Sequence, residues 1–287
     1  MVALRWPDGI ACPRCGCDRN SVLSTRRIWK CKGCQKQFSV KVGTLFEDSP
    51  IGLEKWLPAL WLVVNCKNGI SSYELGRALG VTQKTAWFMC HRLRRAMHTD
   101  PPGKIGGEVE VDQTYIAGKA RFMHKGKRKI EITGAGGMCK TAIMRLLERH
   151  GEEGHSTVLA KVVPNVRRKT LAPEVRQQVE PGSNVYTDAS PSYTELGDDD
   201  THQVIDHAEC YAKGKIHTNG LENFWSLLKR SIKGTYLSVE LFHLFRYLDE
   251  QTFRFNSRKL SDGPRFVKAA SRIVGKRLTC DQLIGQS

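Results

Sequence analysis

Glu108-Val109-Glu110-Val111-Asp112 is the stretch that decides the fold of the second half of the chain. Its valines alternate with its acids, so we expect a β-strand that carries all three carboxylates on one face. Like charges on one face of a strand repel one another unless the face is solvated or bound to cations. The pattern therefore predicts a cation at this face, with Asp112 as the first candidate ligand. An exposed edge strand is the alternative.

Two more acids lie at the ends of predicted elements. The apolar run Asn184-Val185-Tyr186-Thr187-Asp188 ends on an acid, and Asn219-Gly220-Leu221-Glu222 opens a predicted helix. Three carboxylates delivered by two strands and a helix can hold two divalent metal ions for phosphoryl transfer. Simpler interpretations exist, because Asp188 can cap a turn and Asn219 with Glu222 can form an N-cap pair. We favour the catalytic set of Asp112, Asp188 and Glu222.

The predicted helix also carries a lysine at a useful position. Lys229 lies seven residues after Glu222, which is close to two turns, or about 10 Å along the helix axis on the same side. A lysine there can hold a phosphate beside a metal-bound carboxylate. Predicted strands at 141–147, 157–163 and 202–205 and a predicted helix at 168–179 complete an α/β domain over residues 103–260. The basic segment 118–129 is either a flap that contacts DNA or a charged connector.

The first fifty residues carry two Cys-x-x-Cys pairs with fifteen residues between them. Each pair forms a tight knuckle that directs two thiolates at one ion, and two knuckles complete a tetrahedral shell. So few apolar residues do not form a stable core alone, so metal binding would supply folding energy. We predict a structural zinc ribbon at residues 1–49, with the ligands Cys12, Cys15, Cys31 and Cys34. Redox pairs or buried free thiols are the alternatives.

Residues 50–102 have the pattern of a helix-turn-helix domain. Apolar residues recur at helical spacing from residue 53 to 66, and Ser71 with Glu74 forms a capping box before a second helix. A short turn at Gly80 leads to a third helix over residues 83–97. Its polar side carries residue types that suit phosphates and base edges in a major groove, and these are Lys84, Thr85, Arg92 and Arg95. The alternative is a helical bundle whose charges only face water.

Composition restricts the class of protein further. The chain has 287 residues, 40% of them hydrophobic, with a net charge of +16 and a pI near 9.5. An excess of this size points to a polyanionic partner. No apolar run approaches membrane-spanning length, and the first residues lack the apolar segment of a signal peptide. The isolated positions of the other cysteines fit a reducing compartment. We therefore expect a cytoplasmic, nucleoid-associated protein with no membrane partner.

Together these stretches resemble the insertion-sequence transposases that join an N-terminal zinc ribbon to a DDE domain, the ISXO-like group. The resemblance spans nearly the whole chain and is most specific in the last long motif. The matching stretches are Cys12-Pro-Arg-Cys15, Trp29-Lys-Cys-Lys-Gly-Cys34, Glu110-Val-Asp-Gln-Thr-Tyr115, Val185-Tyr-Thr-Asp188, His217-Thr-Asn-Gly-Leu-Glu-Asn-Phe-Trp-Ser-Leu-Leu-Lys-Arg230, Gly234-Thr-Tyr236 and Phe253-Arg-Phe-Asn-Ser-Arg258.

The resemblance implies a fold and an activity. It implies an α/β multi-domain protein in which an RNase H-like mixed sheet flanked by helices follows the two N-terminal domains, with residues 261–287 as a C-terminal helical tail. It also implies Mg²⁺-dependent cleavage and strand transfer on double-stranded DNA at terminal inverted repeats, with two ions for which Mn²⁺ can substitute. Asn219 is the rival of Glu222 for the third position. Gln113 stands where relatives often carry Glu, and we expect that departure to matter little.

Two competing functions stay open at this point. One is a sequence-specific DNA-binding regulator without catalysis, which would gain nothing from three carboxylates that converge on one cleft. The other is a structure-selective nuclease with the same metal chemistry but no strand transfer. A transposase must process two element ends together, so a homo-oligomer is expected in the active complex.

Overall fold

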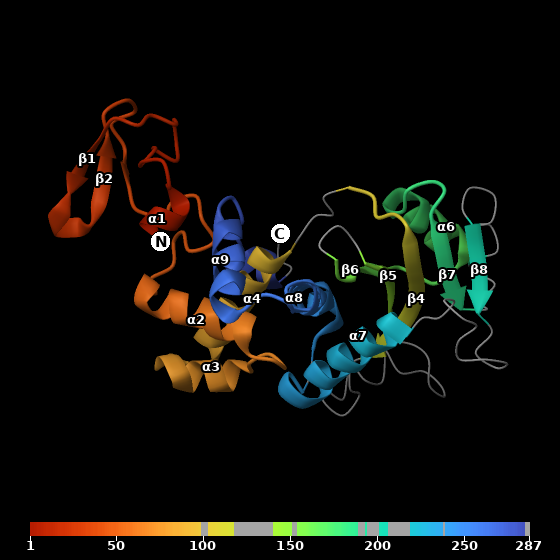
Figure 1. Cartoon of the computed structure of the whole chain (residues 1–287). Coiled ribbons are helices and arrows are strands. Elements are labelled where there is room, and N and C mark those ends of the chain that lie inside the picture. The colour runs from red at the N-terminus through yellow and green to blue at the C-terminus, as the bar shows by residue number, and fades with distance from the viewer. Residues whose placement is uncertain are drawn as a thin grey trace. The chain divides into compact units, whose positions relative to one another are not determined.

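A computed structural model describes residues 1–98, 103–117, 140–150, 154–188, 193, 201–205, 219–237 and 239–284. At 117, 201–205 and 219 it describes the backbone only. The chain divides into two compact units, one formed by Met1–His98 with Lys259–Ser287 and the other by Thr99–Arg258. Figure 1 shows the elements of both. None of the helices in the described ranges is long and apolar enough to cross a bilayer.

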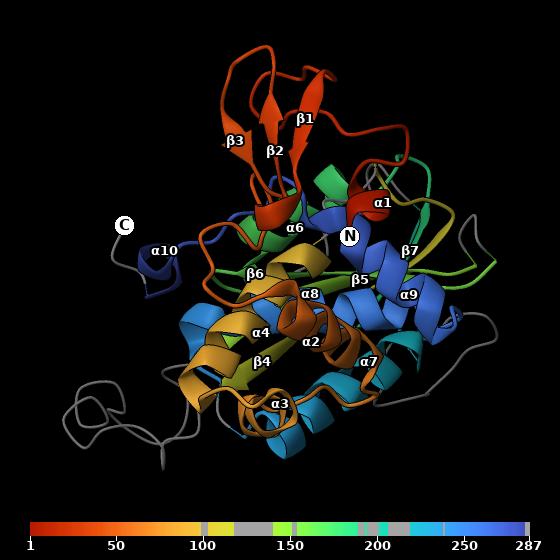
Figure 2. The same cartoon turned by 90° about the vertical axis from the view of Figure 1, so that its left-hand side faces the viewer.

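The first unit begins with a small ribbon of strands. After the short helix α1 (Val2–Arg5), the strands β1 (Asn20–Leu23), β2 (Ile28–Cys31) and β3 (Gln37–Phe38) pair antiparallel in that order, as Figure 2 shows. Three aromatic rings form its core: Trp29 stacks on Phe38 at 5.9 Å between centroids, and Trp6 meets both rings edge-on. Because the core is this small, the ribbon needs a second source of stability.

Three helices follow the ribbon in the same unit. They are α2 (Leu53–Asn65), α3 (Ser72–Leu79) and α4 (Gln83–Met97), which agree with the ranges predicted from sequence. The capping box is present, because Ser71 Oγ accepts from the Glu74 amide and the Glu74 carboxylate accepts from the Ser71 amide at 3.0 Å. Gly80 ends α3 with a left-handed φ of +60°, a conformation that glycine adopts without a steric penalty.

The C-terminal segment packs within this first unit. Helix α9 (Asp262–Ala270) lies along α2, where Phe266 meets Trp61 at 5.6 Å and Arg265 donates to the Asn65 side chain at 3.1 Å. A 3-10 turn (Ser271–Ile273) and helix α10 (Cys280–Ile284) follow. The Leu45 amide donates to the Ile273 carbonyl at 2.9 Å, so the segment predicted as a tail completes the helical layer.

The second unit is built on a mixed sheet. Its described strands are β4 (Glu108–Ala117), β5 (Lys140–Glu148), β6 (Thr157–Val163), β7 (Asn184–Asp188) and β8 (Thr201–Ile205), in the order β6-β5-β4-β7-β8. The pairs β4–β5 and β5–β6 are antiparallel, whereas β4–β7 and β7–β8 are parallel. This confirms the predicted mixed α/β sheet, with β4 at its centre.

Helices cover both faces of the sheet. On one face α6 (Arg168–Gln178) packs through Leu171 and Val175 against Val109 and Val111 of β4. On the other face α7 (Asn219–Arg230) and α8 (Leu244–Asn256) pack against β5 and β6. A π-helical turn (Ser231–Thr235) extends α7, and a 3-10 turn (Leu241–His243) precedes α8. Side chains alternate along β4, so the acids of 108–112 face the α7 side.

The edge strand β6 is closed by a side chain rather than by another strand. Asn256, the last residue of α8, accepts from the Val158 amide at 2.8 Å and donates to the Val158 carbonyl at 2.9 Å. Arg258 adds a bond to the Ser156 carbonyl at 2.8 Å. An exposed strand edge invites pairing with other chains, and these two residues of the 253–258 motif occupy it.

Candidate active site and zinc-binding cluster

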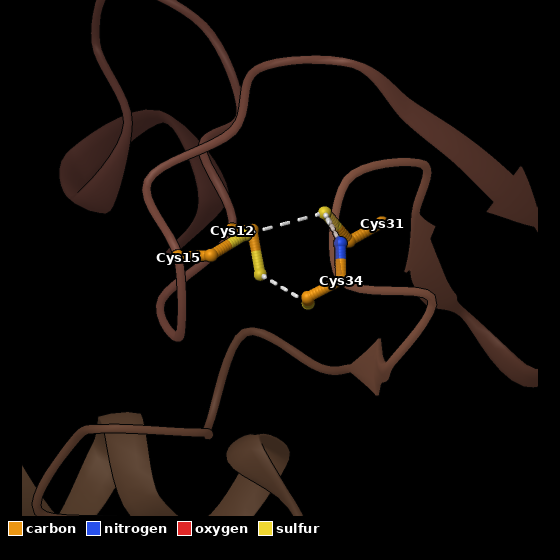
Figure 3. Close-up of side chains that lie close together, drawn as sticks. All are labelled: Cys12, Cys15, Cys31 and Cys34. Carbon is orange, nitrogen blue, oxygen red and sulfur yellow. Dashed lines mark hydrogen bonds between the residues drawn. The ribbon is translucent and has the colours of Figure 1, made fainter.

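The four predicted zinc ligands lie together at the open end of the ribbon. Figure 3 shows the side chains of Cys12, Cys15, Cys31 and Cys34 gathered together. Their sulfur atoms all lie within 4.8 Å of one another. Two pairs are closer: Cys12 and Cys34 at 3.7 Å, and Cys15 and Cys31 at 3.6 Å. Four Zn–S bonds of about 2.3 Å in a tetrahedron separate the sulfurs by about 3.8 Å, so the spacing fits zinc.

The surroundings of this cluster favour a thiolate at Cys31 and Cys12. The amides of Gly33 and Cys34 point at Cys31 Sγ, at 3.3 and 3.5 Å. Burial raises the pKa of the Cys12 thiol, but hydrogen bonds from the backbone at Arg14 and Cys15 and from neighbouring thiols outweigh it and lower the pKa to about 7. At Cys15 a hydrogen bond from the Cys17 backbone lowers the pKa, but hydrogen bonds with neighbouring thiols and burial outweigh it and raise the pKa to about 12. Four thiolates leave no open coordination position, so the chemistry of this donor set is structural.

Cys17 lies beside the cluster without joining it. A Cβ atom at Gly33 would lie 3.2 Å from Cys17 Sγ, so the thiol packs against the second knuckle. Its sulfur is directed at the Arg19 carbonyl, 3.9 Å away.

The acidic face of β4 is neutralised by arginines of the neighbouring strand. Arg149, the residue after β5, places Nε 2.6 Å from Glu110 Oε1 and Nη1 3.4 Å from Glu108 Oε2. Glu110 is only 1% exposed, and its other oxygen accepts from the Leu221 amide at the start of α7 at 3.2 Å. The positive end of a helix favours a carboxylate in this position. Glu110 thus has a structural partner on each side.

A glycine allows α7 to come this close to the strand. A Cβ atom at Gly220 would lie 3.0 Å from Leu147 Cδ1 and 3.2 Å from Glu110 Oε2, closer than most real contacts. A larger residue here would require the side chains of Leu147 and Glu110 to shift by a few tenths of an ångström, and Glu110 is the acceptor of the Leu221 amide.

Asp112 is held by donors on both of its oxygens. Oδ1 accepts from the Gln113 amide at 2.7 Å, and Oδ2 accepts from Trp225 Nε1 of α7 at 2.6 Å. Arg145 of β5 places Nη2 4.0 Å from the same Oδ2. The Asp112 side chain stays 23% exposed, and its two oxygens keep lone pairs that these donors do not use.

Arg145 is an unusual neighbour for that carboxylate. Its side chain is fully buried, its guanidinium lies 3.8 Å from the centre of the Trp225 ring, and its nitrogens have no hydrogen-bond partner in the described part of the chain. Burial lowers its pKa to about 9, and the charges of Asp112 and Glu110 oppose that shift. Arg145 therefore supplies positive charge beneath Asp112 without a direct bond to it.

Asp188 lies next to Asp112 because their strands are parallel neighbours. Val111 pairs with Thr187 in the register of β4 and β7, so the two acids follow side by side. Gln113 Nε2 donates to Asp188 Oδ2 at 3.2 Å, and the Tyr193 hydroxyl donates to Gln113 Oε1. The structure thus brings together two of the three acids predicted from sequence.

Glu222 and Lys229 lie on α7 with exposed side chains. Among the described residues, only the four cysteines bring three or more metal-ligand atoms within 4.8 Å of one another, so Glu222 does not join Asp112 and Asp188 that closely. The side chain of Asn219 lies outside what the structure describes. The Leu221 amide in the first turn of α7 donates to Glu110, so a carboxylate from β4 satisfies this amide.

The residues predicted to face DNA on α4 divide into two groups. Lys84 and Arg95 are exposed, and Thr85 is half-buried at the helix start, where Thr82 caps its amide. Arg92 is a correction: it is only 4% exposed and donates to the carbonyls of Leu278 and Glu47, at 2.9 and 3.2 Å. Its guanidinium holds the C-terminal segment in place and cannot reach DNA. The basic segment 118–129 lies outside the described residues.

Comparison with known proteins agrees with this architecture. Residues 104–256 match the ISXO2-like transposase domain, and residues 1–37 match the transposase zinc-ribbon domain. The chain belongs to the ISXO2-like transposase family. The first match covers the mixed sheet with α7 and α8, which carry the acids, and the second covers β1, β2 and the four clustered cysteines.

Several proteins are similar to this transposase. An uncharacterized protein in transposable element ISH50 of Halobacterium salinarum is 28% identical over 242 residues, 80% of each chain. An uncharacterized transposase-like protein of Haemophilus influenzae is 36% identical over 112 residues, 39% of this chain and 90% of that one. A structure of a simian T-cell lymphotropic virus intasome with a PP2A regulatory subunit covers 67% of this chain and 66% of that chain, at 10% identity and a TM-score of 0.29, which establishes no shared fold.

Sequence reasoning missed the two arginines that balance the acidic strand. A signal for them exists, because Arg145 interrupts the apolar run of β5 and Arg149 follows the end of that strand, four residues later and at a spacing that favours the same face. Arginine is rarely buried without a partner, so its presence in such a run predicts an acid on the neighbouring strand.

We predict that zinc binding requires Cys31 but does not require Cys17. Wild-type protein should carry about one zinc ion per chain, and Cys31→Ser should carry almost none, since one of four ligands is lost. Cys17→Ser is the matched control and should keep its zinc. Elemental analysis of purified protein measures this, and zinc loss from Cys17→Ser would contradict the assignment.

We predict that Glu110 stabilises the second unit through charge. Glu110→Gln keeps the shape and an acceptor for Leu221 but removes the charge opposite Arg149, which should lower the free energy of unfolding by about 3 kcal/mol. The same change at Glu174, which pairs with Lys161 on the surface at 2.7 Å, should cost less than about 1 kcal/mol. Urea denaturation of both variants measures the difference, and equal values would refute the role of Glu110.

Proposed function

We propose that this chain is a DNA transposase that cleaves DNA at the terminal inverted repeats of an insertion sequence and joins the freed ends to target DNA. The observation that carries the proposal is the parallel pairing of β4 and β7, which sets Asp112 beside Asp188 at the centre of the sheet. The strand order, with three antiparallel strands followed by two parallel ones, supports an RNase H-like assignment for the sheet.

The two acids suit a hard divalent cation. Carboxylate oxygens are the ligands that Mg²⁺ and Mn²⁺ prefer, and Asp112 is partly exposed and has unused lone pairs. Two such ions, when bound, would activate the attacking water or 3′-hydroxyl and stabilise the leaving oxygen. Trp225 and the Gln113 amide hold the Asp112 carboxylate in one orientation, and Arg145 offsets its charge from below.

The spacing on α7 supports Glu222 and Lys229 as the other members of the site. Trp225 contacts Asp112 directly, Glu222 lies three residues before it and Lys229 four residues after it. Residues at these spacings are neighbours on one face of a helix. A rotation of the exposed Glu222 side chain toward Asp112 would complete the metal shell, while Lys229 would hold the scissile phosphate. Asn219 remains the rival for the third position.

The first unit is proposed to bind the DNA. In this proposal α3, the turn at Gly80 and α4 form a helix-turn-helix, with Lys84, Thr85 and Arg95 toward the major groove. The ribbon contributes exposed basic side chains that suit phosphate contacts. These are Arg14, Arg19, Arg26, Arg27, Lys30, Lys32 and Lys36. Because two element ends must be processed together, a homo-oligomer is proposed for the active complex, at the nucleoid.

The proposal predicts that both acids are essential for chemistry but not for DNA binding. In a strand-transfer assay with Mg²⁺, an oligonucleotide of the element end and a target plasmid, Asp112→Asn and Asp188→Asn should each lose about 10³-fold in rate. The loss reflects several kcal/mol of charge stabilisation at about 1.4 kcal/mol per tenfold. Glu174→Gln, on the helix of the opposite face, is the control and should retain full activity.

The same assay separates the competing functions. Joined products identify a transposase, cleavage without joining identifies a nuclease, and binding without cleavage identifies a regulator. Unchanged strand transfer in Asp112→Asn would refute the assignment of this site. The sequence of the element end comes from the DNA that flanks the gene.

A further inference from the structure

Gln113 contacts two of the predicted metal ligands, Asp112 and Asp188. Its backbone amide donates to Asp112 Oδ1 at 2.7 Å, and its side-chain Nε2 donates to Asp188 Oδ2 at 3.2 Å. We propose that Gln113 is a positioning residue that fixes the Asp188 carboxylate relative to Asp112, so that both can bind the same divalent cation. The inference rests on the proposed function, since it takes the two acids to be metal ligands.

The orientation of the Gln113 side chain is set by Tyr193. The Tyr193 ring is fully buried in the core between the sheet and α6, and its hydroxyl donates to Gln113 Oε1. A phenol keeps its proton at neutral pH, so it offers a donor and requires the amide oxygen to face it. The amide nitrogen is then directed at Asp188, which can only accept.

An amide has an advantage over an acid in this place. It donates to a carboxylate without adding negative charge next to Asp112 and Asp188, and its donor does not depend on pH. Among the described residues, Arg145 is the only positive side chain that forms an ion pair with Asp112, and its Nη2 lies 4.0 Å from Oδ2. Gln113 instead meets Oδ1 of Asp112 and Oδ2 of Asp188, so the two acids are linked through one residue.

Ligands that are oriented by hydrogen bonds from a second layer of residues bind metal more tightly. Loss of such a partner lowers metal affinity by about 10- to 100-fold in general. The strand register alone places the two acids side by side, but it leaves the rotation of the Asp188 side chain, at the end of β7, undetermined. The bond from Gln113 restrains that rotation at Oδ2.

The test measures Mn²⁺ affinity of the full chain, with free Mn²⁺ counted by electron paramagnetic resonance and zinc retained in the ribbon. Gln113→Met keeps the side-chain length and the backbone bond to Asp112 but loses the bond to Asp188. It should raise the Mn²⁺ dissociation constant about 10- to 100-fold. Gln177→Met, at an exposed position of α6, is the matched control and should bind as wild type does.

Tyr193→Phe provides a second variant that keeps the buried ring. It should weaken Mn²⁺ binding to a smaller extent, because the amide is free to turn away from Asp188. The double variant should bind no worse than Gln113→Met, since Tyr193 acts through the amide. Circular dichroism checks the fold, and if Gln113→Met does not fold, Tyr193→Phe decides the question by the same measurement.

Asp112→Asn distinguishes a failure of the positioning role of Gln113 from a failure of the proposed metal site. If Asp112→Asn loses Mn²⁺ binding but Gln113→Met and Tyr193→Phe bind as wild type does, the positioning role is wrong and the proposed site stands. If Asp112→Asn binds Mn²⁺ as wild type does, the proposed site itself is wrong. A full loss of affinity in Tyr193→Phe together with unchanged affinity in Gln113→Met would also overturn the inference.

Discussion

Three carboxylates on one face of β4 must be balanced before that face can be covered by a helix. Removing a charge from water costs several kcal/mol unless it is paired and hydrogen-bonded. Arg149 pairs with Glu108 and Glu110, and the Leu221 amide of α7 donates to Glu110. Trp225 donates to Asp112, and Arg145 lies 4.0 Å from it. The position of α7 depends on these contacts, because the Leu221 amide in its first turn and the Trp225 side chain four residues later both reach β4. The other side chains of α7, including those of Glu222 and Lys229, take their positions from these contacts.

Much of the fold could be predicted from local patterns. The helix limits at 72–79 and 83–97 follow from a capping box, a glycine and an apolar stripe, each a short-range signal. The four cysteines were predictable because two knuckles specify one tetrahedral site whatever the rest of the chain does. Asp112 and Asp188 could be proposed as partners, although their closeness depends on the parallel register of two strands more than seventy residues apart.

The remaining features depend on long-range packing that no local pattern contains. Arg92 has the same spacing and chemistry as a residue that faces DNA, but the C-terminal segment returns to cover it, so its partners come from Glu47 and Leu278. Gln113 gives no sign in the sequence that its side chain contacts Asp188, because the two partners of that side chain, Asp188 and Tyr193, lie 75 and 80 residues further along the chain. Glu222 lies on α7 with an exposed side chain, and its carboxylate is not grouped with those of Asp112 and Asp188, because the direction of a side chain on a helix surface is not set by sequence spacing.

The central claim is that Asp112 and Asp188 share a divalent cation. Anomalous diffraction from crystals of the full chain grown with Mn²⁺ tests this most directly, because the zinc and manganese signals separate at their absorption edges. If the two acids share a cation, manganese peaks should lie within about 2.3 Å of oxygens from both acids, together with a zinc peak among the four cysteines. Manganese bound to other residues, with Asp112 still closed by Trp225 and Asp188 contacting only protein, would contradict it.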